Sequence, residues 1–372
     1  MSHHVKHQID EQIIEQSVGL PHGGPIAKLF SQRGENDMKR LAFSLLCTVC
    51  SFVGAGATAF AQDKVEWRYF SYFPVNDNAV KLTRQFAEDV GTATNGRLKI
   101  NVFAAGELPY KAPDVLRAVA TNQVQMGDMA VGFASGDVPE LNVLSLPFLC
   151  TSFDAFKKAI VGIGPVVDQV IGDRFKVDVA MNWTMPAQNF WFNRPITKST
   201  EIKGLKVRTW NPEQVNMVQL LGGSPVSISS AEVIPALERK VIDGAITSAL
   251  SANEWRAYEI VNTGLMANFA MGHQVTMINK AELAKLPEDL RTILLRKVDE
   301  WEPKYMEMAA KGEGEARSNL SANGVKLVDP SGEDYAHVRA TMLPMWNEWA
   351  NKHGETGKKL LGLARAGCIG TN

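Results

Sequence analysis

The order of strand and helix signals along the chain predicts an α/β fold with two lobes. Short alternating or apolar runs, typical of strands, are separated by runs with an apolar residue every three to four positions, typical of helices. The chain has 372 residues, and the part after residue 61 is long enough for two domains of ordinary size. No repeat or low-complexity linker divides this part, which suggests that the chain crosses between the lobes more than once. Two such lobes leave a cleft in which a small ligand can bind.

Each expected strand is a short apolar run bounded by turn residues. In residues 97–103, for example, Leu98, Ile100 and Val102 alternate with other residues and face one way. Strands alternating with helices are typical of α/β folds with mainly parallel sheets. The expected strands are residues 67–72, 126–133, 177–182, 190–192, 205–208, 244–247 and 275–279, together with 97–103.

Helices are expected where apolar residues recur on one face. One begins at Ala79, another follows Pro113, and a capping box at residues 229–232 begins a third. A long helical pattern starts at Pro287 and can continue to the Asn-Gly stop that ends at residue 324. The glycine-rich residues 161–165 lack a third glycine and end in proline, so we interpret them as a turn.

The N-terminal 61 residues differ from the rest of the chain. Residues 1–37 are polar and without a sustained period, and we expect them to precede the true start of translation. Residues 38–61 have the order of a secretory signal peptide: a basic start, an apolar run and Ala-Phe-Ala before Gln62. The apolar run is shorter than the ~20 residues that a membrane-spanning helix needs. We therefore expect cleavage before Gln62, export to the periplasm, and a fold that excludes residues 1–61.

Composition and motifs argue against several classes of function. The net charge of −1 provides no broad basic surface, so nucleic acid is not an expected partner. Metalloprotease, hydrolase, P-loop and dinucleotide-binding motifs are absent from the sequence. After residue 61 only Cys150 and Cys368 remain, and their distance in sequence implies neither a disulfide framework nor a metal site. We therefore expect no enzyme, cofactor or metal, although an enzyme with a cleft nucleophile or base stays a rival hypothesis.

Arg208 is the strongest candidate for binding an anion. A Lys-Gly turn precedes residues 205–208, in which apolar and basic residues alternate up to Arg208, and residues 210–212 then break the strand pattern. A guanidinium in that place can hold a carboxylate by two parallel hydrogen bonds. On spacing alone, the alternative of a solvated arginine at a strand end stays open.

A series of short motifs runs through residues 65–350. They are residues 106–108, 139–141, 146–148, 202–208, 222–226, 231–233, 236–237, 241–244 and 286–290. In this order and spacing the chain resembles the solute receptors of TRAP transporters (tripartite ATP-independent periplasmic transporters, DctP type). The resemblance implies a receptor without catalysis, in which two lobes joined by β-strands close around an organic acid and deliver it to membrane permease subunits.

The resemblance also implies the arrangement of the lobes. We expect the two-lobe periplasmic-binding-protein fold, with hinge strands, a ligand cleft between the lobes and a long late helix. The first lobe is expected to comprise residues 62–186 and about 274–312. The second lobe is expected to comprise residues 187–273 and about 313–372.

The residues at the family's ligand positions predict the site. Arg208 matches the carboxylate-binding arginine, and Asn211 and Asn78 match positions that often carry polar contacts, although each asparagine could instead stabilise a turn. Gln188 stands where the sialic-acid receptors carry a second arginine, and Thr247 stands where they carry an asparagine. The complete set of expected ligand contacts is Arg208, Gln188, Asn211, Asn78, Thr247, Phe190, Trp210 and Ser230.

These departures predict the kind of ligand. Without a second arginine, the site is not expected to form two firm ion pairs, while Phe190 and Trp210 favour an apolar or aromatic ligand body. Aromatic clusters are more often core than pocket, which remains an alternative for both residues. We expect a small monocarboxylate with a hydroxy, oxo or aromatic group. The alternatives are a C4-dicarboxylate receptor and a periplasmic sensor that presents its ligand-bound form to a signalling kinase.

Overall fold

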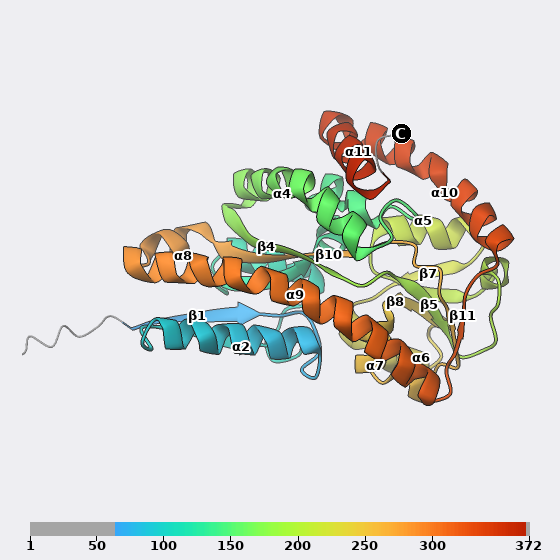
Figure 1. Cartoon of the computed structure of the whole chain (residues 1–372), viewed down its shortest axis with the longest axis horizontal. Coiled ribbons are helices and arrows are strands. Elements are labelled where there is room, and N and C mark those ends of the chain that lie inside the picture. Colours follow the sequence, from blue (N-terminus) through green and yellow to red (C-terminus); the bar gives the residue numbers. More distant parts are fainter. Residues whose placement is uncertain (1–63, 370–372) are drawn as a thin grey trace, which may run out of the picture. The chain divides into compact units, whose positions relative to one another are not determined.

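Two β-sheets organise residues 64–369, which are the residues that the computed structural model describes (Figure 1). The expected N-terminal extension and signal peptide, residues 1–61, lie outside the described residues. The described part combines the two sheets with helices, so the predicted α/β fold with two lobes is confirmed. Within residues 64–369, no helix has both the length and the apolar character required to span a membrane.

The first sheet has five strands, in the order β2, β1, β3, β10, β4. Strand β1 pairs in parallel with β2 and β3, whereas β10 runs antiparallel to β3 and β4. Strand β10, in the interior of the sheet, is buried along its whole length. The strands are β1 (Val65–Phe70), β2 (Leu98–Phe103), β3 (Met126–Ala130), β4 (Val177–Met185) and β10 (Gly272–Asn279).

The second sheet has six strands, in the order β11, β9, β5, β8, β6, β7. Strand β6 pairs in parallel with β7 and β8, and β5 runs antiparallel to β8 and β9. The strands are β5 (Asn189–Phe192), β6 (Lys206–Thr209), β7 (Ser224–Ser227), β8 (Gly244–Thr247), β9 (Thr263–Leu265) and β11 (Lys326–Val328).

The expectation of mainly parallel sheets is confirmed within residues 64–369, with one exception in each sheet: β10 and β5 run antiparallel to the strands beside them. The physical reason for the exceptions is the path of the chain between the sheets. Strand β4 leads directly into β5 of the other sheet, and β9 leads back into β10. The strand that follows each crossing runs antiparallel to the strands beside it in its new sheet.

Helices cover both sheets and one of them connects the two halves. The long helix α9 (Glu288–Ala322) contacts α2 and β4 of the first half and α7 and β11 of the second (Figure 1). This helix confirms the long late helix predicted from residue 287. The other α-helices are α2 (Asn78–Ala93), α3 (Val115–Ala120), α4 (Phe153–Phe175), α5 (Pro212–Leu220), α6 (Val233–Glu238), α7 (Ala249–Glu254), α8 (Lys280–Lys285), α10 (Gly332–Lys352) and α11 (Gly354–Cys368).

Short 3-10 helices fill several connections. The predicted capping box is present, with the Glu232 carboxylate accepting hydrogen bonds from the backbone N–H and the hydroxyl of Ser229 (3.1 and 2.6 Å). The 3-10 segments are η1 (Ala112–Asp114), η2 (Val131–Ala134), η3 (Pro139–Ser145), η4 (Ser199–Ile202), η5 (Ser230–Glu232) and η6 (Ala257–Glu259).

Residues 161–165 are not a turn, as the sequence suggested, but lie inside α4. A side chain at Gly162 would come within 2.9 Å of Leu363 on α11, and one at Gly164 would meet Asn182 on β4. The glycines therefore allow α11 and β4 to pack closely against α4. The glycines and the proline of residues 161–165 resembled a turn because a sequence pattern does not show which elements pack against a helix.

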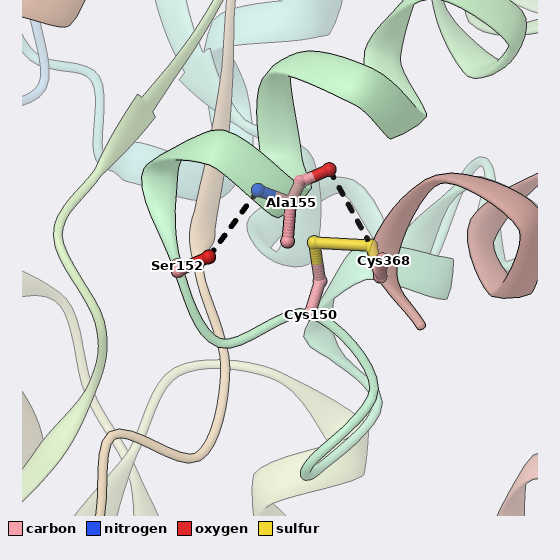
Figure 2. Close-up of a disulfide and its surroundings, with 4 residues drawn as sticks. All are labelled: Cys150, Ser152, Ala155 and Cys368. Atoms are coloured by element: carbon pink, nitrogen blue, oxygen red, sulfur yellow. Dashed lines mark hydrogen bonds between the residues drawn. A yellow bond between two sulfur atoms is a disulfide. The ribbon is translucent and has the colours of Figure 1, made fainter. Parts of the chain in front are cut away.

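A disulfide joins Cys150 to Cys368, a pairing that the spacing of the two cysteines did not predict (Figure 2). The two Cα atoms are 5.0 Å apart although 218 residues separate the cysteines. Cys150 precedes α4, whose N-terminus is capped by Ser152, and Cys368 ends α11. The C-terminal helix therefore packs on α4, beside the first sheet. The lobe boundaries expected from the sequence remain a prediction.

Candidate ligand-binding site

A cavity lies where residues from both sheets meet. Its free volume, including the part open to solvent, is about 350 Å³, at the small end of the range for ligand pockets. Seven lining residues come from the first half and its crossing strands: Tyr72, Phe73, Ala130, Phe133, Met185, Gly272 and Gln274. Seven others come from the second half: Gln188, Arg208, Trp210, Ser230, Thr247, Ser251 and Trp255.

Arg208 is buried at the wall of this cavity. Strand β6 lies between β7 and β8 and holds the side chain in place, and only 1% of Arg208 is exposed. The guanidinium donates from Nε to Ile228 O (3.0 Å) and from Nη1 to Ile246 O (2.9 Å). A guanidinium has five N–H groups, so three remain for a ligand. The prediction that Arg208 lies in a cleft and not on the solvated surface thus agrees with its place in the structure.

The charge of Arg208 is not neutralised by the described part of the chain. No acidic residue among 64–369 forms an ion pair with Arg208. The charge of Glu232 raises the pKa of Arg208, but the Glu232 carboxylate forms its ion pair with Lys111, at 3.0 Å. Burial lowers the pKa of Arg208 to about 9, so the group stays cationic at neutral pH. Burying a cation without a partner is unfavourable, and an anionic ligand would offset this cost.

Aromatic rings form much of the remaining wall. Tyr72 stacks on Phe73 with ring centroids 4.2 Å apart and meets Phe133 edge-on at 5.3 Å. Phe133 in turn contacts Trp210 at 5.6 Å, which joins rings from the two halves across the cavity. A ligand in this space would therefore contact ring faces and edges besides the guanidinium of Arg208.

Two glutamines hold these rings in position. Gln188 Oε1 accepts from Trp210 Nε1 (3.2 Å), and its Nε2 donates to Pro186 O (2.9 Å). Gln274 Oε1 accepts from the hydroxyl of Tyr72 (2.8 Å). The hydroxyl of Ser230 is buried and has no hydrogen-bond partner within residues 64–369. The wall therefore offers neutral polar groups, of which Ser230 is free to bond a ligand.

The structure brings five of the eight predicted contacts to the cavity: Arg208, Gln188, Thr247, Trp210 and Ser230. The other three lie elsewhere. Asn211 caps α5, its Oδ1 accepting from Gln214 N (2.8 Å), and Asn78 begins α2 with Oδ1 bonded to Lys81 Nζ (3.1 Å). Phe190 packs in the core, 5.3 Å from the ring of Phe269. These placements match the structural alternatives that the sequence left open.

Sequence reasoning missed most of the aromatic wall. Tyr72 and Phe73 follow the first strand, Phe133 follows β3, and Trp255 follows α7. A signal was available, because ligands in α/β folds gather at the carboxyl ends of strands. Residues at the carboxyl ends of the strands predicted at 67–72 and 126–133 were therefore candidates. Trp255 carried no such signal.

No cluster of three or more histidine, cysteine, aspartate or glutamate side chains suited to a metal occurs in the described part of the chain. His273, the most buried histidine within residues 64–369, bonds Asn182 through Nε2 (3.0 Å), and burial lowers the pKa of His273 to about 3. It is a neutral core residue that lies outside the cavity.

Comparison with known proteins identifies the family. The model of the bacterial extracellular solute-binding proteins, family 7 (DctP), matches residues 70–353, which is most of the chain. The chain belongs to this family. It is therefore a solute-binding receptor of the TRAP type and not an enzyme, which confirms both predictions.

Individual relatives agree with this assignment. A solute-binding protein of Albidiferax ferrireducens is 26% identical over 296 residues, covering 77% of this chain and 85% of the relative. DctP7 of Bordetella pertussis, an extracytoplasmic solute receptor binding pyroglutamic acid, has a TM-score of 0.77 at 25% identity, with 81% of this chain and 99% of that one covered. A TRAP periplasmic solute-binding protein from Shewanella oneidensis with bound succinate has a TM-score of 0.76. The match covers 82% of this chain and 99% of that one. At 21% identity, that likeness shows the fold alone.

Proposed function

We propose that this receptor binds a small monocarboxylate in the periplasm and delivers it to the membrane permease of a TRAP transporter. One observation carries the ligand class: Arg208 is the only charged residue that lines the cavity within residues 64–369, and it has no acidic partner there. A carboxylate that accepts from its free N–H groups forms charge-assisted hydrogen bonds in a site shielded from water.

The rest of the wall favours a ligand with one negative charge and a ring or polar group. A second carboxylate would find no second cation, because Gln188 stands where the sialic-acid receptors have arginine. The aromatic rings and the Ser230 hydroxyl suit a hydroxy, oxo or aromatic acid. Pyroglutamic acid, the ligand of the Bordetella relative, has one carboxylate and a ring carbonyl and is therefore the first acid to test.

Binding is expected to close the receptor. Residues of both halves line the cavity, so a bound acid contacts both at once and stabilises the closed arrangement over an open one. We assign the hinge to the crossings between β4 and β5 and between β9 and β10. This assignment uses the predicted lobe boundaries, of which residue 186 lies between β4 and β5 and residue 274 lies just inside β10.

A thermal-shift screen of the protein without its first 61 residues tests the ligand class. The panel comprises pyroglutamate, lactate, pyruvate, phenylacetate, glucuronate and succinate. We expect monocarboxylates to raise the melting temperature, with about 2.7 kcal/mol of stabilisation at a hundredfold excess over Kd. Stabilisation by succinate alone would instead support the C4-dicarboxylate receptor.

Two further measurements test location and role. N-terminal sequencing of the exported protein is expected to begin at Gln62, and an uncleaved chain would contradict the predicted signal peptide. Uptake of the bound acid should require the permease. Normal uptake by cells that lack this receptor, together with a lost transcriptional response to the acid, would support the sensor alternative.

A further inference from the structure

Two acidic residues, Asp77 and Glu254, meet where the two halves of the chain touch beside the cavity. Asp77 precedes α2, which follows β1 of the first sheet, and Glu254 ends α7, which follows β8 of the second. The backbone N–H of Asn78 donates to Glu254 Oε1 (3.1 Å), and that of Ala79 donates to Asp77 Oδ1 (3.0 Å). Both carboxyl groups therefore bind the N-terminus of α2, one from each half.

The second oxygen of each carboxyl group is buried without a partner. Asp77 Oδ2 and Glu254 Oε2 have no hydrogen-bond partner within the described residues, although both carboxyl groups bind consecutive N–H groups at the same helix start. Two ionised carboxylates repel each other strongly in a site from which water is excluded. A single proton between these two oxygens replaces the repulsion with a hydrogen bond. We call Asp77 and Glu254 the acid pair.

Burial acts on both members of the acid pair in the same direction. Burial raises the pKa of Asp77, and burial together with the Asp77 charge raises the pKa of Glu254. Both shifts favour the protonated state. A proton on Glu254 then donates to the Asp77 carboxylate, which already accepts the Ala79 N–H.

The groups around the acid pair do not neutralise it. Lys81 on α2 lowers the pKa of both acids, yet it forms no ion pair with either of them. Asp128 on β3 is a buried acid whose pKa the Asp77 charge raises, and Tyr72 is a neutral phenol. On α9, which packs against both α2 and α7, Glu313 pairs with Arg317 (2.9 Å). A proton is therefore the available means of stabilising the acid pair.

We propose that the acid pair holds one proton when the two halves are closed over the cavity, and that this proton makes ligand affinity depend on pH. The proposal rests on the proposed function, in which the halves open and close. In an open receptor both acids face water and ionise with ordinary pKa values near 4. Closure then takes up about one proton between pH 5.5 and 8, so affinity falls as pH rises, by at most about tenfold per pH unit.

The acid pair also supports the wall of the cavity. Trp255, the residue after Glu254, lines the cavity, and its buried indole N–H has no hydrogen-bond partner within residues 64–369. Asp77 and Glu254 are thus positioning residues. They do not line the cavity, but the Glu254 carboxylate accepts from Asn78 N–H and so joins the two halves beside Trp255.

The test compares wild-type receptor with Glu254→Gln, whose amide can accept from Asn78 N–H and donate to Asp77 without a titrating proton. Pyroglutamate is titrated calorimetrically between pH 5.5 and 8 in buffers of different ionisation enthalpy. At pH 7 we expect the wild type to take up close to one proton more per bound pyroglutamate than the variant, and its Kd to rise more steeply with pH. Equal proton uptake and parallel Kd profiles overturn the proposal.

Two further variants sharpen the test. Asp77→Asn keeps an N-cap acceptor and should lose the same proton uptake as Glu254→Gln. Glu259→Gln changes an exposed acid that pairs with Arg256 and should behave as wild type. If Glu259→Gln lost proton uptake to the same extent, the loss would result from the change in net charge, and the proposal would fail.

A ligand-free measurement separates this proposal from the proposed function. If no acid in the panel binds, the proposed function fails together with its open state. The folded protein then keeps the arrangement described here, with the acid pair buried, and melting temperatures judge the acid pair. Folded-state pKa values above the unfolded ones mean that stability is greatest at low pH and is lost as pH rises. The wild-type melting temperature should then fall more steeply than that of Glu254→Gln between pH 5.5 and 8. Melting temperatures of the wild type and Glu254→Gln that change equally with pH would overturn the proposal for the acid pair.

Discussion

The cavity and the C-terminal helices both bury charged side chains but leave them in opposite states. At the start of α10, Asp334 accepts from the N–H and the hydroxyl of Ser199 at 2.9 to 3.2 Å. In the cavity, Arg208 donates to two carbonyls and has no acidic partner among residues 64–369. A buried charge satisfied within the chain serves structure, whereas one left unsatisfied is available to a ligand. Variants in the two regions should therefore separate stability from binding.

Removing the disulfide should have the largest effect, and only on stability. In Cys150→Ser/Cys368→Ser the free energy of unfolding is expected to fall by about 2–5 kcal/mol, because a long loop of the unfolded chain is no longer closed. Urea unfolding measures this change. The Kd for pyroglutamate should stay the same, since neither cysteine lines the cavity. A higher Kd together with an unchanged free energy of unfolding would contradict this prediction.

Arg208→Ala should show the opposite behaviour. The affinity for pyroglutamate is expected to fall a hundredfold or more, about 3 kcal/mol, because the ligand carboxylate loses its charged donor. The melting temperature of the ligand-free protein should not fall, since a buried cation without a partner is removed. Calorimetry measures the affinity, with Arg174→Ala as control, because Arg174 pairs with Glu140 outside the cavity. Undiminished binding by Arg208→Ala would contradict the proposed role.

Glu213 on α5 should make stability depend on pH. Its carboxylate accepts from Asn142 of η3, and burial raises the pKa of Glu213 to about 7. In the unfolded chain the pKa is near 4.3, so the stabilising proton is fully bound below that pH and is lost as pH rises through 7. Between pH 5 and 8 the wild type should lose about 2 kcal/mol more than Glu213→Gln. Melting curves at both pH values measure this, and equal losses would contradict it.

Trp210→Phe should have the smallest effect, and only on binding. The variant keeps a ring against Phe133 but loses the hydrogen bond to Gln188, so we expect about a fivefold weaker Kd for pyroglutamate, near 1 kcal/mol. The control is Trp346→Phe, which loses a hydrogen bond to Pro147 O (2.9 Å) away from the cavity. If Trp346→Phe weakened pyroglutamate binding more than Trp210→Phe, the hydrogen bond in the cavity wall would not account for the loss of affinity.

Much of the fold could be predicted from local patterns. The strand at residues 244–247 and the helix at 288–322 lie where alternation and helical spacing placed them. These patterns record which face of an element is buried, which is a local property. The mixed direction of the sheets could not be predicted in this way, because it follows from where the chain crosses between them.

The candidate site could be predicted only in part. Arg208 was recognisable because a strand-end arginine followed by a break is visible in a few consecutive residues. Phe190 showed the limit of the same reasoning, because its strand was expected but its face was not, and the ring packs in the core. Trp255 and Gln274 reach the cavity from elements that the sequence did not connect to it.

By itself the sequence determined the alternating elements, the arginine at the strand end and a resemblance that the family match confirms. Only the tertiary structure decided that Cys150 meets Cys368 and that Asp77 meets Glu254. Periodicity reports on neighbours within one helix or strand. Such pairs arise only when folding brings together segments that are far apart in the chain, and their burial is what alters their charge.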